Sequence, residues 1–169
     1  MIDEQTKLRA LLDKQDIHEV MMRYCRAVDR MDIDLLKTCY FPGAHDDHGP
    51  FKGSAEEFFE IVSGLSDPYS FSQHMICNEF VELDGDVARS ESYFMMPSGI
   101  ERDGEKLIWI LAGRYVDRFE RREGEWRIAH RVVTQDWEVT LPATEANFLP
   151  NPFVQGRRST DDVVYKSAA

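Results

Sequence analysis

Cysteine, long apolar runs and basic residues are all scarce in this chain, and each scarcity argues against a class of protein. Three cysteines in 169 residues cannot all pair with one another and lack metal-ligand spacing, which predicts reduced thiols and a cytoplasmic location. No apolar run reaches the roughly 18 residues of a membrane span, and the polar N-terminal residues do not resemble a signal peptide. Lysine and arginine number 20 against 31 acidic residues, a net charge of -11. Because nucleic acids and anionic membranes require basic surface, we expect neither as a partner.

Gly-rich phosphate loops, internal repeats and low-complexity segments are also missing from the sequence. Without a phosphate loop there is no sign of a nucleotide, and we expect no cofactor. A chain of 169 residues with 43% hydrophobic content suits one globular domain with a substantial core. We place this domain at residues 1–140. Residues 141–169 form a tail that we expect to cover a pocket or a subunit interface, with Phe148, Leu149 and Phe153 as its anchors.

Two helices are predicted in the first 43 residues. Between residues 3 and 28 the apolar side chains recur at spacings of three and four, which is typical of an amphipathic helix with one face on a core. Asp32 has the chemistry of an N-cap and predicts a short second helix. We expect Pro42 and Gly43 to end that helix.

A short strand and a third helix follow. Residues 44–52 include a dense polar run and indicate an edge strand that leads into a turn. Ser54 and Glu57 have the spacing of a capping box, in which each side chain satisfies a backbone N–H of the other residue. The apolar residues after them predict a helix that ends near Gly64.

The remaining pattern changes from helix to strand. Four blocks of strand-like residues are separated by Asp84-Gly85, Asp103-Gly104 and Glu123-Gly124, and such pairs are a strong hairpin signal. Helices followed by an antiparallel meander place the chain in the α+β class. Strands this long must bend, so we expect a cone-shaped α+β barrel, a curved antiparallel sheet closed by the N-terminal helices around one cavity. The blocks are residues 70–83, 87–100, 106–122 and 126–140.

The first strand block carries the central candidate side chain. Alternate residues of a strand point to opposite faces, so His74 is expected to share its face with Ile76, Asn78 and Phe80. A histidine on a mostly apolar wall is either a core residue with a hydrogen-bond partner or the base of an active site. Because its imidazole is mostly uncharged at neutral pH, a histidine can accept a proton from a substrate.

Several marks occur in a characteristic order along residues 14–140. They are a first helix ending in Tyr-Cys-Arg-Ala-Val-Asp29, a Lys52-Gly53 turn before a capped helix, His74 early in a long strand, Gly113-Arg114-Tyr115, and Trp126-Arg127-Ile128. In this order the chain resembles the SnoaL-like branch of the NTF2-like superfamily. Within it the chain is similar to the cofactor-independent bile-acid 7α-dehydratases and hexachlorocyclohexane dehydrochlorinases and, more distantly, to scytalone dehydratases.

This resemblance implies a set of catalytic residues. The dehydrochlorinases and the bile-acid dehydratases use an aspartate at the end of the first helix and a histidine on the sheet as a pair, and Asp29 and His74 match these positions. Tyr24 matches a functional tyrosine of the bile-acid enzymes. Arg131 stands where the dehydrochlorinases have a pocket arginine.

Substrate contacts are expected from five further residues. The chain departs from the dehydrochlorinases at Asp46 and His48, where those enzymes have bulkier and less polar residues, so the resemblance implies a more polar pocket here. Asn78 is expected to hydrogen-bond a substrate or to satisfy a bulge. Phe58 and Phe94 are candidates for the apolar lining.

Each of these residues also has a plain structural interpretation. Asp29 suits a helix end, Tyr24 suits the core with its hydroxyl at the rim, and Arg131 suits an ion pair with a cross-strand acid such as Glu91. Residues 45–48 contain aspartate and histidine, which are ligand types of zinc and iron. Alternation leaves only two of the four on one face, so we favour a polar pocket wall or a solvated edge and expect no metal.

The sequence and the resemblance together predict a lyase that eliminates a hydroxyl or halide from a hydrophobic cyclic or aromatic small molecule. His74 is the expected base, Asp29 its orienting partner, and Tyr24 and Arg131 the electrostatic helpers. Three alternatives stay open: an isomerase like ketosteroid isomerase, a binding protein, and the non-catalytic β subunit of an aromatic-ring-hydroxylating dioxygenase. The resemblance also implies a homodimer or homotrimer.

Overall fold

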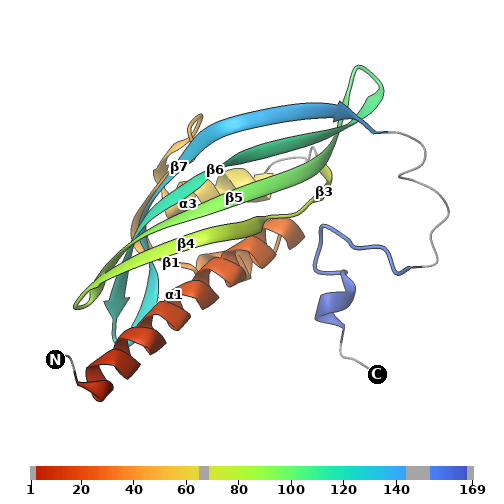
Figure 1. Ribbon diagram of the computed structural model, residues 1–169. Helices are drawn as coiled ribbons and strands as arrows, with labels where there is room; N and C mark the ends of the chain where they lie inside the picture. Colours follow the sequence, from red (N-terminus) through yellow and green to blue (C-terminus); the bar gives the residue numbers. More distant parts are fainter. Residues whose placement is uncertain (1–2, 65–68, 144–152, 167–169) are drawn as a thin grey trace.

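The computed structural model describes residues 3–64, 69–143 and 153–166 and has the expected α+β architecture (Figure 1). Three helices precede a meander of long strands. Along the described residues, no helix combines the length and the apolar character that crossing a membrane requires. The elements are α1 (Glu4–Arg30), α2 (Ile33–Lys37), β1 (Tyr40–Asp47), β2 (Lys52–Ser54), α3 (Ala55–Gly64), β3 (Tyr69–Ser72), β4 (Met75–Asp84), β5 (Val87–Arg102), β6 (Glu105–Arg122), β7 (Glu125–Pro142) and the short 3-10 helix η2 (Val163–Tyr165).

Helix α1 buries one stripe and extends slightly beyond the predicted end. Its N-cap is Asp3, whose side chain accepts a hydrogen bond from the Thr6 amide at 3.0 Å. It ends at Met31, which takes a left-handed conformation with φ of 53° and donates its N–H to the Ala27 carbonyl. The pattern predicted an end near Val28, so the structure adds about half a turn. This extension contains Asp29.

The short elements after α1 differ in part from the prediction. Asp32 caps α2 as expected and accepts a hydrogen bond from the Leu35 amide at 3.0 Å. The prediction that Pro42 and Gly43 end this helix is wrong, because α2 stops at Lys37 and both residues lie inside β1. Proline tolerates a strand position where its missing N–H is not needed by a neighbour.

The capping box of α3 is confirmed. The Ser54 amide donates to the Glu57 carboxylate at 2.8 Å, and the Glu57 amide donates to the Ser54 hydroxyl at 3.2 Å. Strand β1 is not an edge strand, contrary to expectation, since it lies between β2 and β7. It pairs with β7 in parallel, whereas the β1–β2 pair is antiparallel.

The sheet follows the order β2-β1-β7-β6-β5-β3, with β4 also paired to β5. The pairs β3–β5, β4–β5, β5–β6 and β6–β7 are antiparallel, which confirms the predicted meander. The three hairpin turns are also confirmed, with positive φ at Gly85, Gly104 and Gly124. The strands curve strongly along their length, and the sheet does not close on itself (Figure 1).

The first predicted strand is broken in two places, which corrects the predicted faces. Strands β3 and β4 are separated at Gln73 and His74, and the register of β4 on β5 shifts between Ile76 and Glu79. This bulge reverses the alternation, because an extra residue moves the following side chains to the other face. Phe80 is therefore 66% exposed, whereas Val81 is buried. The expectation that Asn78 and Phe80 share the face of His74 is wrong.

A single core lies between the helices and one face of the sheet. Apolar side chains of α1 meet aromatic and aliphatic side chains of β5, β6 and β7, and α3 adds two phenylalanines. The largest fully buried side chain is a charged one, Arg131. The fully buried apolar residues include Ile17, Met21, Leu36, Phe119 and Ile128.

All three cysteines are free thiols, as the sequence predicted. Cys25 and Cys39 are buried and Cys77 is exposed. Burial raises the pKa of Cys25 to about 12 and that of Cys39 to about 11, so both thiols stay protonated at neutral pH.

The described part of the C-terminal tail lies against the end of α1. The Arg158 guanidinium donates to the carbonyls of Val28 and Asp29 at 3.4 and 3.3 Å, and Arg30 lies 3.7 Å from Asp162. Phe153, one of the three predicted anchors, is 76% exposed. The other two predicted anchors, Phe148 and Leu149, lie outside the described residues.

We expect Gly113→Ala to destabilise the fold, by about 2 kcal/mol or more, because overpacking forces the surrounding backbone to move. A Cβ at Gly113 would stand 1.8 Å from the Thr134 carbonyl oxygen, next to a register shift between β6 and β7. Urea denaturation measures the change in the free energy of unfolding. Gly64→Ala is the matched control, since no atom of the described residues, other than its chain neighbours and the nearby backbone of its own helix, lies within 4 Å of its Cβ position. An equal effect of both substitutions would contradict the prediction.

Candidate active site

The side chains of Asp29 and His74 meet at the junction between α1 and the sheet. The His74 Nδ1–H donates to Asp29 Oδ1 at 2.7 Å, and the His74 backbone N–H donates to Asp29 Oδ2 at 2.8 Å. The Ser72 hydroxyl adds a third contact to the carboxylate at 3.3 Å. Asp29 thus holds both the ring and the backbone of His74. This orientation leaves His74 Nε2 as the proton-accepting nitrogen of the neutral ring.

Local structure explains why the two residues meet. Asp29 stands in the last turn of α1, and His74 stands in the break between β3 and β4. In this break the backbone N–H of His74 donates to the Asp29 carboxylate instead of to a neighbouring strand. Only 9% of the His74 side chain and 13% of the Asp29 side chain are exposed. Low exposure strengthens the hydrogen bonds within the pair, since little water competes for them.

Tyr24 lies beside this pair. Its ring meets the His74 ring edge-on, with ring centres 6.3 Å apart. Tyr24 is 1% exposed, and burial raises its pKa well above that of an ordinary tyrosine. The hydroxyl therefore remains a hydrogen-bond donor at any physiological pH.

Arg131 is buried behind Tyr24 rather than exposed in a pocket. Its guanidinium lies 4.1 Å from the ring centres of both Tyr24 and Tyr115. Two hydrogen bonds, at 2.8 and 2.7 Å, join it to the Asp117 carboxylate. Burial opposes its charge, but Asp117 together with Tyr40 and Tyr24 outweighs that effect, and the pKa of Arg131 is raised. The alternative partner Glu91 is wrong, because Glu91 pairs with Arg114 at 3.6 Å.

Asp46 and His48 form a second carboxylate–imidazole pair. Asp46 is fully buried, accepts a hydrogen bond from the Tyr40 hydroxyl at 2.7 Å, and accepts one from His48 Nδ1. His48 Nε2 lies 3.2 Å from the Tyr24 hydroxyl. Asp46 and His48 thus form a polar wall beside Tyr24, and Tyr24 contacts the imidazoles of both pairs.

The three remaining expected contacts lie at different distances from this centre. Phe58 stacks on the His48 ring with centres 4.4 Å apart. Phe94 stacks on Tyr115 at 4.5 Å and is 3% exposed, so it belongs to the core behind the site. Asn78 is exposed at the bulge of β4 and does not join the other site residues.

Three residues of the site escaped the sequence analysis, namely Ser72, Tyr40 and Asp117. Ser72 and Tyr40 each donate to a site carboxylate. Nothing in the local sequence distinguishes them from ordinary strand residues. Asp117 had a partial signal, since it stands directly opposite Arg131 in the β6–β7 hairpin. Counting back from the Glu123-Gly124 turn would have paired them but for the one-residue register shift between the turn and Arg131.

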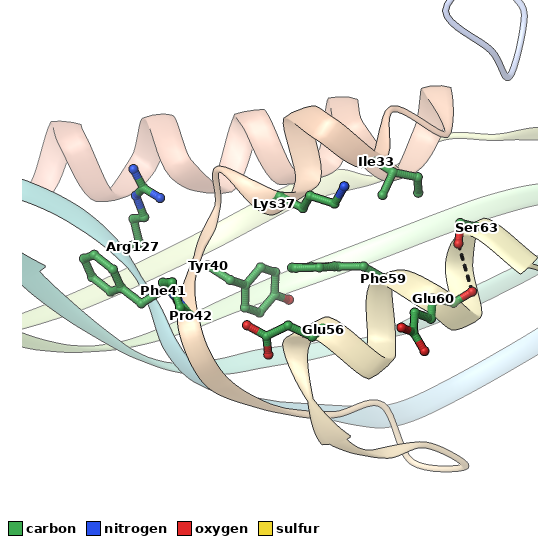
Figure 2. Close-up of a pocket in the computed structure, with 10 residues that line it drawn as sticks. All are labelled: Ile33, Lys37, Tyr40, Phe41, Pro42, Glu56, Phe59, Glu60, Ser63 and Arg127. Atoms are coloured by element: carbon green, nitrogen blue, oxygen red, sulfur yellow. Dashed lines mark hydrogen bonds between the residues drawn. The ribbon is translucent and has the colours of Figure 1, made fainter.

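The structure also has a hollow of about 440 Å³ on the outer side of Tyr40 (Figure 2). It lies between α2, β1 and α3, with Phe59 and Tyr40 at its base and Lys37 and Glu60 at its rim. Neither Asp29 nor His74 lines it. Within the described part of the chain, no three histidine, cysteine or acidic side chains gather closely enough to hold a metal ion.

Comparison with known proteins identifies the family. A model of the SnoaL-like domain matches residues 9–132, most of the chain and all of the site described above. The protein belongs to the SnoaL-like domain family. An uncharacterised protein of Mycobacterium tuberculosis is 28% identical over 126 residues, which are 73% of this chain and 85% of that protein.

Solved structures share the fold of this SnoaL-like protein. Hexachlorocyclohexane dehydrochlorinase LinA-type3 from Novosphingobium barchaimii has a TM-score of 0.74 at 16% identity, covering 86% of this chain and 99% of the enzyme. A candidate scytalone dehydratase from Novosphingobium aromaticivorans has a TM-score of 0.69 at 15% identity, covering 80% of this chain and 91% of that protein. At such identities the likeness shows the cone-shaped α+β fold and leaves the activity to be argued from the site.

We expect Asp117→Asn to lower the free energy of unfolding by about 3–5 kcal/mol, because it leaves the buried charge of Arg131 without its partner. Glu91→Gln is the control, since it neutralises the partly exposed acid that faces Arg114. For such a pair a loss below about 1 kcal/mol is expected. Urea denaturation of both variants checks the prediction. A loss from Glu91→Gln as large as that from Asp117→Asn would count against the assignment of partners.

Proposed function

We propose that this SnoaL-like protein is a cofactor-independent lyase that eliminates water or a related leaving group from a hydrophobic cyclic or aromatic molecule. The observation that carries the proposal is the Asp29–His74 pair, in which one carboxylate holds both the ring and the backbone N–H of the histidine. A structural histidine needs only one partner for its ring. The second hydrogen bond, from the backbone N–H, holds the carboxylate in place, so the Nδ1–H bond gives Nε2 a fixed direction, as a base requires.

The proposed reaction begins with transfer of a carbon-bound proton to His74 Nε2. Asp29 stabilises the imidazolium that results, since its carboxylate already accepts the Nδ1–H. The electron pair of the broken C–H bond forms a double bond with the neighbouring carbon, and the leaving group departs from that carbon. A carbonyl next to the reacting C–H bond would make the proton acidic enough for this step.

Tyr24 and Arg131 have different parts in this proposal. Tyr24 offers a protonated hydroxyl beside the His48 imidazole, with its ring against His74, and can donate to oxygen that gains negative charge. Arg131 has no exposed surface, so it acts through the Tyr24 ring that it stacks on rather than by touching substrate. It is a positioning residue.

The surroundings support an apolar substrate. Partly exposed hydrophobic side chains from β4, β6 and the loop between β1 and β2 pack against the core, and they include Phe51, Ile76, Trp109 and Leu111. The solved relatives are consistent with elimination chemistry, because the name of the dehydrochlorinase describes loss of hydrogen chloride. Burial of a ring against such side chains would contribute about 25 cal/mol per Å² of apolar surface.

We expect His74→Gln and Asp29→Asn each to reduce turnover by roughly 100-fold or more, since a positioned base contributes about that much to a rate. The probe is a set of cyclic β-hydroxy and β-chloro ketones. Exchange of the α-proton in deuterium oxide, followed by NMR, reports proton removal, and ultraviolet absorbance of the enone reports elimination. Exchange without elimination would favour an isomerase.

The matched control is His18→Gln. His18 also joins α1 to β4 through an imidazole–carboxylate contact, with Nδ1 2.8 Å from Glu79, but its side chain is 42% exposed. Its loss should leave both rates within about threefold of wild type, as for a surface substitution. Thermal unfolding followed by circular dichroism verifies that each variant folds. If both His74→Gln and Asp29→Asn retain the wild-type rates, the proposed base is rejected.

A further inference from the structure

The second carboxylate–imidazole pair has features that packing alone does not require. Asp46 has 0% exposure, and its carboxylate accepts from Tyr40 on one oxygen and from His48 on the other. A fully buried carboxylate costs several kcal/mol unless it is paired and hydrogen-bonded. Tyr40 and His48 offset this cost for Asp46, and His48 also contacts Tyr24, which adjoins the Asp29–His74 pair.

Among the buried carboxylates of the described residues, Asp46 is the one that no arginine or lysine pairs with. Asp13 pairs with Arg121, Asp117 with Arg131 and Asp162 with Arg30. Arg131 stands opposite Asp46 in the β1–β7 register, but the hydrogen bonds of Asp46 go to Tyr40 and His48. A proton on His48 would give Asp46 the cationic partner that the other three buried carboxylates already have.

The His48 ring is also placed to reach a bound molecule. About 23% of its side chain is exposed, more than twice the exposed fraction of the His74 side chain, and one face of its ring is covered by Phe58. Its Nε2 contacts the Tyr24 hydroxyl at 3.2 Å, and the Tyr24 ring contacts His74. The two imidazoles thus lie on either side of one tyrosine.

We propose that His48 is a second catalytic residue, the general acid that protonates an oxygen leaving group. The inference rests on the proposed lyase function and names its substrate class, a cyclic β-hydroxy carbonyl compound. His74 Nε2 takes the proton from the carbon next to the carbonyl, and the C–H electron pair becomes the double bond. The C–O bond breaks, and its electron pair takes the proton from His48 Nε2, so that water departs.

The protons balance over one turnover. The step begins with cationic His48 and neutral His74, and it ends with neutral His48 and cationic His74. Solvent water carries the proton back from His74 to His48 before the next substrate reacts. Asp46 and Asp29 act alike in this scheme, since each carboxylate holds a Nδ1–H and stabilises the cationic form of its own ring.

The proposal predicts a dependence on the leaving group that a structural role would not produce. Hydroxide is a poor leaving group and needs a proton, whereas chloride leaves without one. With His48→Gln, kcat for a β-hydroxycyclohexanone should fall roughly 100-fold or more, the usual contribution of a positioned acid. With the matching β-chloro ketone, kcat should change by no more than about threefold after subtraction of the uncatalysed rate.

Two further variants complete the experiment. His48→Phe keeps an aromatic ring to stack on Phe58 and should show the same selective loss, which guards against failure of one variant to fold. His45→Gln is the control, because His45 lies on β1 three residues before His48, is exposed, and stacks on His130 instead. It should alter neither rate.

Failure of this inference is distinguishable from failure of the proposed function. An equal loss with both ketones, or no loss with either, while proton exchange still depends on His74, would overturn the role of His48 and leave the lyase intact. If the wild-type protein neither exchanges the α-proton nor eliminates from either ketone, the lyase proposal and the role of His48 are both rejected.

Discussion

The site depends on one carboxylate, that of Asp29, which accepts hydrogen bonds from both the ring and the backbone of His74. These bonds join the last turn of α1 to the break between β3 and β4, 45 residues further along the chain. A strand break normally leaves a backbone N–H without a partner, and a buried unpaired N–H costs about 1–3 kcal/mol. Asp29 removes that cost and orients the imidazole with the same group. The geometry of the proposed base is therefore part of how the helix docks on the sheet.

The interior behind this pair is polar and charged, yet its buried charge has partners. Arg131 is enclosed by two tyrosine rings and paired with Asp117, and the interaction of the guanidinium with both ring faces offsets part of its desolvation. Tyr24 thereby contacts Arg131 on its face and His74 at its edge. A rigid tyrosine in this position gives the site a wall whose hydroxyl cannot easily turn away, and preorganised donors of this kind are the ones that stabilise developing charge.

Much of the fold followed from local chemistry in the sequence. The capping box at Ser54 and the Gly-containing turns are determined by neighbouring residues, so they could be predicted, and Asp29 and His74 were matched through a family resemblance. The parallel pairing of β1 with β7 could not be predicted, because it joins segments more than 80 residues apart. The bulge in β4 depends on tertiary contacts. The prediction assumed unbroken alternation through this strand and therefore placed Asn78 on the wrong face. Arg131 was assigned to a pocket, although its burial and its pairing with Asp117 set it behind the pocket wall.

The two carboxylate–imidazole pairs differ in how their geometry is maintained, and this difference suits different chemical tasks. Asp46 and His48 are two residues apart, so the end of a single strand sets their relation. Asp29 and His74 come from separate elements, and a shift of α1 against the sheet would separate them. A base must be aimed at one carbon-bound proton, and this long-range pair gains that precision from the packing of the whole domain. An acid that protonates an oxygen lone pair has a wider range of productive angles, which a local pair with a partly exposed ring can meet.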